Sequence, residues 1–383
     1  MKSAQYKFFT PTKVLFGEGC SGDIGKWLKD FGSTKILLVT DEGLKNIGLA
    51  GQIEDRIRNE GLTVITYSEV NENPTVRNVD EGRNLIKQEN VDAIVALGGG
   101  SSMDAAKAMG ILSVHQGSIN EYELGLKPFQ KSGPPLIAIP TTSGTGSEAT
   151  MGAVITDPVT HRKFDVVDSL MAPRLALVDP LLTLSLPATL TGATGMDALT
   201  HAIEGYTATL ASPLSDALHL KAIELIGKNL KAAYIDGQNR EARKNVMMAS
   251  LIAGIGFPNS GLGAVHGLSM PLGGRFNIPH GIANAIILPY VMKFNLSSCS
   301  TKFSQIAQAL GKRNRKPEES VEAILELRRE LSIPVLRTYD VQLKELPILA
   351  KDALGRNSNC VTNPREVTES DAIEIFRSAL EEE

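Results

Sequence analysis

Four side chains of the types that bind divalent metals lie within residues 192–281, namely Asp197, His201, His266 and His280. Asp197 and His201 are four residues apart in a stretch with a helical pattern, so we expect them on one helix face about one turn apart. The Gly and Pro residues between His266 and His280 allow a sharp turn that returns the second histidine toward the first. The spacing therefore predicts that these side chains converge on one divalent ion.

The ligand types restrict the ion without fixing it. Three imidazoles and one carboxylate suit Zn, Fe, Co, Ni or Mn, because imidazole is borderline in softness and the carboxylate oxygen is hard. A single histidine in such a sequence is more often a core or capping residue than a ligand, but a carboxylate buried in an apolar segment is costly unless it is paired or bound to a metal. The remaining histidines, His115, His161 and His219, stand among polar or turn residues, and we expect them at the surface.

The elements that must position these groups fall into two kinds. In the first half, apolar runs of strand length alternate with amphipathic helical stretches; the runs are residues 35–40, 62–67, 92–100 and 136–142. This alternation predicts a parallel sheet with helices on its faces. Residues 153–179 indicate short strands and a hairpin, and beyond Pro187 the patterns are helical.

A length of 383 residues exceeds the usual size of a single hydrophobic core, so two domains are expected. We predict an α/β dinucleotide-binding domain over residues 1–183 and an all-helical metal-binding and catalytic domain over residues 184–383. The boundary falls within residues 181–186.

Two loops rich in glycine and hydroxyl groups follow predicted strands. The first runs from Gly98 through Ser102 into a helix that carries Asp104 and Lys107, which places free backbone N–H groups at a helix N-terminus, where phosphate binds readily. The second, residues 139–150, follows the next strand. Ligands of open α/β sheets sit at the carboxyl ends of strands, so the pair of loops predicts a nucleotide pyrophosphate site, although a glycine run can also be only a tight turn.

Asp41 ends the first predicted strand. A carboxylate there can accept hydrogen bonds from an adenosine ribose and repel a 2′-phosphate, which favours NAD over NADP. A helix N-cap is an equally good interpretation of this position.

The composition is that of an ordinary globular protein that handles small molecules. A net charge of −4 and a pI near 6.0 argue against a nucleic-acid partner. The three cysteines are far apart and form no CxxC pair, which favours a reducing cytoplasm over a disulfide framework or a thiolate metal site. No signal peptide or membrane-spanning run is visible, so we expect a cytoplasmic protein without a membrane partner.

Longer motifs add a resemblance that runs nearly from end to end. The chain resembles the iron-containing (group III) alcohol dehydrogenase family, near its lactaldehyde reductase and 1,3-propanediol dehydrogenase branch. The motifs are FGEG at 16–19, NPTV at 73–76, GGGSxxDxAK at 98–107, PTTSGTGSE at 140–148, TGMDALTHAIE at 194–204, VHGLSMPLGG at 265–274, IPHGIANAIILP at 278–289 and TNPR at 362–365.

The resemblance implies the dehydroquinate synthase-like fold of that family, with the active site in the cleft between an α/β dinucleotide domain and a helical domain. It makes Asp197, His201, His266 and His280 the catalytic metal ligands, with Fe2+ the expected ion and Zn2+ an alternative. The residues that it places around the nucleotide are Asp41, Asn73, Gly98, Gly99, Gly100, Ser101, Asp104, Thr141, Thr142, Ser147 and Lys163.

In similar enzymes the positions of Phe257 and Cys360 line the substrate pocket. Met270 stands where many relatives carry a second histidine near the nicotinamide, and methionine cannot relay a proton. The proton is then expected to leave through water or the cofactor ribose hydroxyls. Gly152 stands where some relatives hold a pocket asparagine, so the identity of the substrate does not transfer.

The resemblance implies reversible hydride transfer between NAD(H) and a small primary alcohol or aldehyde, and we expect a homodimer or larger homo-oligomer. One alternative is a dehydroquinate-synthase-like lyase or a polyol-type metal enzyme on a related scaffold. The lyase must grip a phosphorylated, carboxylated substrate, yet the metal segment offers few cations, Arg243, Lys244 and Arg275 among them. A second alternative is a non-catalytic nucleotide-binding protein, against which the intact ligand set argues.

Overall fold

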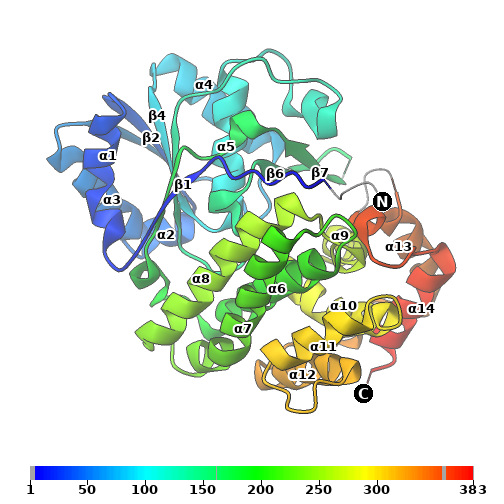
Figure 1. The fold of residues 1–383 in the computed structure, drawn as a ribbon. Coiled ribbons are helices and arrows are strands. Elements are labelled where there is room, and N and C mark those ends of the chain that lie inside the picture. The colour runs from blue at the N-terminus through cyan, green and yellow to red at the C-terminus, as the bar shows by residue number, and fades with distance from the viewer. Residues whose placement is uncertain (1–4, 161, 356–358, 383) are drawn as a thin grey trace. The chain divides into compact units, whose positions relative to one another are not determined.

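The computed structural model describes residues 5–160, 162–355 and 359–382, which fold into two compact units (Figure 1). One unit comprises Thr10–Thr142 and Gly146–Thr183 and carries the main sheet; the other comprises the described residues of Met1–Phe9, Ser143–Thr145 and Leu184–Glu383 and is helical. Whether residues 1–183 and 184–383 are separate domains stays a prediction.

A parallel six-stranded sheet forms the centre of the first unit, as the alternating pattern predicted. In spatial order its strands are β1 (Lys13–Phe16), β8 (Leu175–Val178), β5 (Leu136–Pro140), β4 (Ala93–Gly98), β2 (Lys35–Val39) and β3 (Thr63–Tyr67). The predicted strands are confirmed with trimmed ends. The edge strand β1 was not predicted. It has only four residues and pairs with one strand, β8, so its sequence shows no clear alternation of buried and exposed side chains.

Alternate side chains of the sheet face two helical layers. In β2, Ile36 and Leu38 pack with one pair of helices, whereas Leu37 and Val39 pack with the other pair. Figure 1 shows the first pair, α1 (Ile24–Asp30) and α3 (Leu49–Asn59), on one side of the sheet, and the second pair, α4 (Val76–Gln88) and α5 (Gly100–Ser113), on the other. The short helix α2 (Glu42–Asn46) follows β2. Because both faces are covered, the strands read as continuous apolar runs.

The predicted hairpin is also present. Strands β6 (Gly152–Asp157) and β7 (Arg162–Val167) pair antiparallel, with Ile155 opposite Phe164. Both of these side chains are buried and pack with Val79 of α4.

The second unit has no strand among its described residues and is built around one core. Its helices are α6 (Ala188–Thr207), α7 (Pro213–Ile235), α8 (Arg240–Gly256), α9 (Ala264–Phe276), α10 (His280–Asn295), α11 (Ser300–Ala309), α12 (Pro317–Glu330), α13 (Leu346–Ala353) and α14 (Glu369–Leu380). Helix α6 is buried almost all round along its C-terminal half, as expected of a central helix.

Short 3-10 helices connect these elements. They are η1 (Cys20–Asp23), η2 (Ile119–Gly125), η3 (Ser147–Ala149), η4 (Ser169–Met171), η5 (Pro180–Thr183), η6 (Phe257–Asn259), η7 (Leu336–Thr338), η8 (Leu343–Glu345) and η9 (Asn359–Thr362).

Within the described residues, no single helix has the length and apolar composition to cross a membrane. One pair that passes together by length and composition, Arg240–Asn259 with Ala264–Phe276, is bent by 106° at its break.

Two histidines that we expected at the surface are buried instead. His219 is fully buried on α7, where it lies in step with the core residues Ala222, Ile223 and Ile226. His115 is buried because its ring packs against aromatic side chains, and its Nδ1 donates to the Ile111 carbonyl at 2.8 Å while Nε2 accepts from the Gln130 amide at 2.9 Å. The prediction for these two was wrong, and His161 lies outside the described residues.

Candidate metal centre and nucleotide loops

Helix α6 supplies the first two predicted ligands from one face. Asp197 and His201 are both buried, and His201 Nδ1 lies 3.9 Å from Asp197 Oδ2. The spacing of four residues therefore places the carboxylate and the imidazole together as predicted.

Helices α9 and α10 supply the other two predicted ligands. Sequence patterns indicated only a turn here, and the turn is confined to 277–279, where Asn277 adopts φ 53° and ends α9. His266 lies in the first turn of α9, and His280 is the first residue of α10.

Gly281 lets α10 approach α6 closely. A Cβ atom on Gly281 would lie 2.2 Å from the Ala193 carbonyl oxygen, so any other residue would push the two helices apart. This approach brings His280 Nε2 to 3.5 Å from Asp197 Oδ1.

The structure thus brings all the predicted ligands together. Ligand atoms of Asp197, His201 and His266 lie within 4.8 Å of one another, and all three residues are buried. The ring of His266 lies 4.5 Å from that of His201 and 5.3 Å from that of His280, measured between centroids. The His280 side chain is 38% exposed, which leaves this corner of the cluster open to solvent.

Glu204 contacts a predicted ligand and was not among the predicted site residues. One of its carboxylate oxygens, Oε2, accepts a hydrogen bond from His266 Nδ1 at 2.5 Å, and Oε1 accepts from the Val265 amide at 2.5 Å. The carboxylate therefore favours the His266 tautomer with an unprotonated Nε2, the form that a metal ligand needs, and it also caps the start of α9. The available signal was its spacing of seven residues from Asp197, two turns along the same helix face.

Asn284 also belongs to this cluster and was not predicted. It is fully buried one turn after His280, and its amide nitrogen lies 2.7 Å from Asp197 Oδ1. The same nitrogen lies 3.2 Å from His266 Nε2 and 3.1 Å from His280 Nε2.

Protonation states suit metal binding. Burial lowers the pKa of His201 to about 3, so the imidazole is neutral near pH 7. Burial by itself raises the pKa of Asp197, but the adjacent imidazoles outweigh it and hold that pKa below its usual value. His201 Nδ1 is a buried atom without a hydrogen-bond partner among the described residues. A carboxylate, the neutral His201 imidazole and its partnerless nitrogen fit a divalent ion.

The residues predicted for the substrate pocket are distributed over both units. In the helical unit, Phe257 stacks on His201 with ring centroids 4.7 Å apart, Met270 lies half-buried one turn after His266, and Cys360 is buried in the helical core. Gly152 begins β6 in the sheet-bearing unit, where its carbonyl accepts from Lys107. Their roles at a pocket stay predictions.

The first glycine loop has the backbone that a ligand site needs. Gly98 adopts φ 151°, and a Cβ atom there would lie 2.5 Å from Ser102 Oγ, so only glycine fits. Gly99 caps α5 without a side chain, which leaves the first helical N–H groups, those of Gly100 and Ser101 among them, without a side-chain cap.

The second loop lies beside the first. The Thr141 amide donates to the Gly98 carbonyl at 2.9 Å, and a Cβ atom on Gly99 would lie 3.3 Å from Thr142 Oγ1. Asp41 caps α2 through the Leu44 amide at 2.9 Å, which satisfies the N-cap interpretation, while its other oxygen faces Gly98. Several predicted nucleotide residues therefore lie at one end of the sheet.

Other predicted nucleotide residues form hydrogen bonds within the sheet-bearing unit. Lys163 Nζ donates to Asn73 Oδ1 at 2.7 Å, and Ser101 Oγ donates to the Glu72 carbonyl. Ser147 Oγ donates to Asp104 Oδ1 at 2.6 Å.

Asp104 and Ser147 belong to a buried polar network centred on Lys107. Lys107 Nζ donates to Ser147 Oγ at 2.7 Å and to Thr150 Oγ1 at 3.0 Å, and it lies 3.8 Å from Asp104 Oδ1. Burial lowers the pKa of Lys107 to about 8 and raises that of Glu148 to about 7. This network ties α5 to the second glycine loop.

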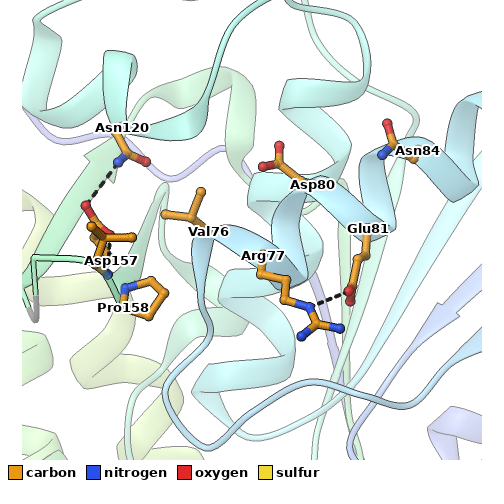
Figure 2. A pocket seen from close by; sticks show the side chains of 9 residues that line it. Val76, Arg77, Asp80, Glu81, Asn84, Asn120, Asp157 and Pro158 are labelled. Carbon is orange, nitrogen blue, oxygen red and sulfur yellow. Dashed lines mark hydrogen bonds and ion pairs between the residues drawn. The ribbon is translucent and has the colours of Figure 1, made fainter.

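A separate surface pocket of about 550 Å³ opens beside α4 (Figure 2). Arg77 pairs with Glu81 along it at 2.6 Å, and Asn120 donates to Asp157 at 3.4 Å. The described residues that line it include none of the predicted site residues, so the pocket belongs to neither candidate site.

Comparison with protein families decides the relationship. A model described as iron-containing alcohol dehydrogenase matches residues 11–180, and one described as the C-terminal part of the Fe-containing alcohol dehydrogenase family matches residues 191–380. The chain belongs to the iron-containing alcohol dehydrogenase family.

The relatives of this chain include members of the predicted branch of the family. It is 38% identical to 1,3-propanediol dehydrogenase of Citrobacter freundii, over 99% of this chain and 100% of the relative. It is 39% identical to lactaldehyde reductase of Escherichia coli, over 95% and 97%, and 39% identical to NAD-dependent methanol dehydrogenase of Bacillus methanolicus, over 97% and 99%. This chain is accordingly an alcohol oxidoreductase.

Solved structures confirm the predicted fold class. The crystal structure of a 1,3-propanediol oxidoreductase matches with a TM-score of 0.95 and 37% identity, over 98% of this chain and 100% of that one. Sulfoacetaldehyde reductase from Bifidobacterium kashiwanohense, solved in complex with NAD+, matches with a TM-score of 0.93 and 28% identity over 100% of both chains.

Proposed function

We propose that the chain is a divalent-metal-dependent, NAD(H)-dependent alcohol dehydrogenase and aldehyde reductase for small neutral substrates. The observation that carries this proposal is the convergence of Asp197, His201, His266 and His280 from three helices, with matching protonation states. Fe2+ is the proposed ion because of the family, with Zn2+ the alternative.

The metal's contribution is Lewis acidity toward the oxygen of a bound alcohol or carbonyl. The protein's contribution is position and charge. Asp197 supplies the negative charge, Glu204 holds the His266 ring through Nδ1, and Phe257 covers one face of the His201 ring. Met270 cannot carry a proton, so the substrate proton leaves through water at the exposed side near His280 or through the cofactor ribose hydroxyls.

The nucleotide end of the proposal depends on the sheet-bearing unit. The uncapped start of α5 and the glycine backbone at Gly98 and Gly99 suit a pyrophosphate. The carboxylate of Asp41 disfavours a 2′-phosphate, which supports NAD over NADP. Two relatives add support, since the Bacillus methanolicus methanol dehydrogenase is NAD-dependent and the sulfoacetaldehyde reductase was solved with NAD+.

A neutral substrate is favoured because Arg243, Lys244 and Arg275, three of the cations in residues 192–281, already have partners. Arg243 is buried and donates to Thr191 and to two carbonyls, Arg275 pairs with Asp352 at 2.6 Å, and Lys244 lies 4.0 Å from Glu241. A phosphorylated, carboxylated substrate, as the lyase alternative requires, would need such cations to be available.

A cytoplasmic location and a homodimer or larger homo-oligomer complete the proposal. Cys20 and Cys299 are free thiols and support the reducing location, and burial raises the pKa of the Cys20 thiol to about 12, which makes this thiol unreactive.

The test is a panel of short aldehydes with NADH and NADPH, and of short alcohols with NAD+ and NADP+, run on chelated protein reloaded with Fe2+, Zn2+, Mn2+ or Co2+. We expect turnover with NADH and unbranched short aldehydes only after metal is added. Turnover without metal, or none with any alcohol or aldehyde, would overturn the proposal.

A further inference from the structure

The amide of Asn284 faces three ligand atoms at once. Its nitrogen lies 2.7 Å from Asp197 Oδ1, 3.2 Å from His266 Nε2 and 3.1 Å from His280 Nε2. An NH2 group has two hydrogens, so it cannot satisfy three acceptors.

The other end of the same amide has no partner. Asn284 is fully buried, and its Oδ1 makes no hydrogen bond within the part of the chain that the structure describes. A buried carbonyl oxygen without a hydrogen-bond donor is energetically unfavourable. If the amide turns, Asn284 Oδ1 therefore loses no hydrogen bond.

Metal binding changes which end of the Asn284 amide is favoured beside the predicted ligand atoms. An ion held by the neighbouring carboxylate and imidazoles lies about 2.0–2.2 Å from each ligand atom, on the lone pairs that the NH2 group now faces. N–H hydrogens directed at a cation are repelled by it, whereas an amide oxygen is a good partner for a divalent ion.

We propose that Asn284 is a positioning residue of the metal centre whose carboxamide turns about χ2 when an ion is held, so that Oδ1 replaces the NH2 group opposite Asp197, His266 and His280. The inference rests on the proposed metal centre and adds to it an oxygen that faces the ion. Because the nitrogen and oxygen of an amide occupy nearly the same space, the turn needs no movement of α10.

Two isosteric replacements separate an oxygen role from an N–H role. Asn284→Asp keeps an oxygen and loses the donor, whereas Asn284→Leu loses both. Asn295→Leu is the matched control, because Asn295 is a buried amide on the same helix that pairs with Asn363 at 2.9 Å and contacts no predicted ligand.

The experiment titrates Co2+ into the chelated full-length chain and its variants, and measures the dissociation constant by chelator competition and by the visible Co2+ spectrum. Circular dichroism and the melting temperature of each chelated variant verify the fold. We expect Asn284→Leu to weaken binding about 10–100-fold and to change the spectrum. Asn284→Asp should bind at least as tightly as the wild type, and Asn295→Leu should match the wild type.

Equal weakening in Asn284→Asp and Asn284→Leu would overturn the inference, since the N–H donor would then be the group that matters. Unchanged binding in Asn284→Leu, or equal weakening in Asn295→Leu, would also overturn it. A wild-type chain that binds no Co2+ would overturn the metal centre itself, and the inference with it.

Discussion

Glu204 combines two tasks in one carboxylate. It accepts from His266 Nδ1 and from the Val265 amide, so it orients the ring of a predicted ligand and caps the helix that carries this ring. Partners of this kind fix the tautomer of a ligating histidine and raise its basicity.

We predict that Glu204→Gln weakens Co2+ binding about 10–100-fold, because the amide carries no charge to support the imidazole. Chelator competition measures the effect. Glu241→Gln is the control. The Glu241 side chain is 74% exposed, and its ion-pair partner, Lys244, is not a predicted ligand. Equal affinity in Glu204→Gln and wild type would contradict the role of Glu204.

Because His219 is buried, we expect the free energy of unfolding to depend on pH. Its ring packs between Gly205 and Gly256, Nε2 lies 3.0 Å from Ser260 Oγ, and burial lowers its pKa to about 3. In the unfolded chain the pKa is about 6.5, so between these values the unfolded state binds the extra proton. The contribution of His219 is therefore complete above about pH 6.5 and is lost as the pH falls toward 3.

We predict that His219→Gln removes part of this dependence, up to about 1.4 kcal/mol per pH unit below pH 6. Urea unfolding of chelated protein at pH 7 and pH 5 measures it. The variant will be less stable at pH 7, but its free energy of unfolding should fall less on acidification than that of the wild type. An identical fall in both proteins would refute the assignment.

At the scale of elements, helix α5 is joined to the second glycine loop through a buried cation. Lys107 has three hydrogen-bond acceptors and two carboxylates, Asp104 and Glu148, in its surroundings. The loop that follows β5 therefore depends on a charge carried by the helix that follows β4.

We predict that Lys107→Met destabilises the chain by about 3–5 kcal/mol, because it leaves buried carboxylates without their cation. Adding Asp104→Asn should recover part of the loss. Lys26→Met is the control and should change almost nothing, since Lys26 and Asp23 form an exposed pair. Denaturant unfolding measures all three, and a loss in Lys107→Met no larger than in Lys26→Met would contradict the network's importance.

At the scale of the whole molecule, local patterns predicted more than contacts between distant elements. Strand-length apolar runs predicted the parallel sheet, and the spacing of Asp197 and His201 placed both on one face of α6. The approach of α10 to α6 could not be predicted, because it depends on the space that Gly281 leaves beside Ala193.

The roles of Glu204 and Asn284 were hidden for the same reason. Each residue sits at helical spacing from a predicted ligand, but its partner lies on another helix. The burial of His219 was missed because its neighbours in sequence, rather than its helical period, suggested a surface position. Tertiary contacts determine the burial and role of such residues, whereas the local sequence pattern determines where helices and strands form.

The central claim is that one divalent ion at Asp197, His201, His266 and His280 enables alcohol and aldehyde turnover. The most direct test titrates Fe2+ anaerobically into chelated wild type and His266→Ala while NADH oxidation by a short aldehyde is followed. We predict that wild-type activity rises from near zero and reaches its plateau at about one ion per chain, and that His266→Ala binds no ion tightly and stays inactive. Full activity of the chelated wild type, or of His266→Ala without bound metal, would contradict the account.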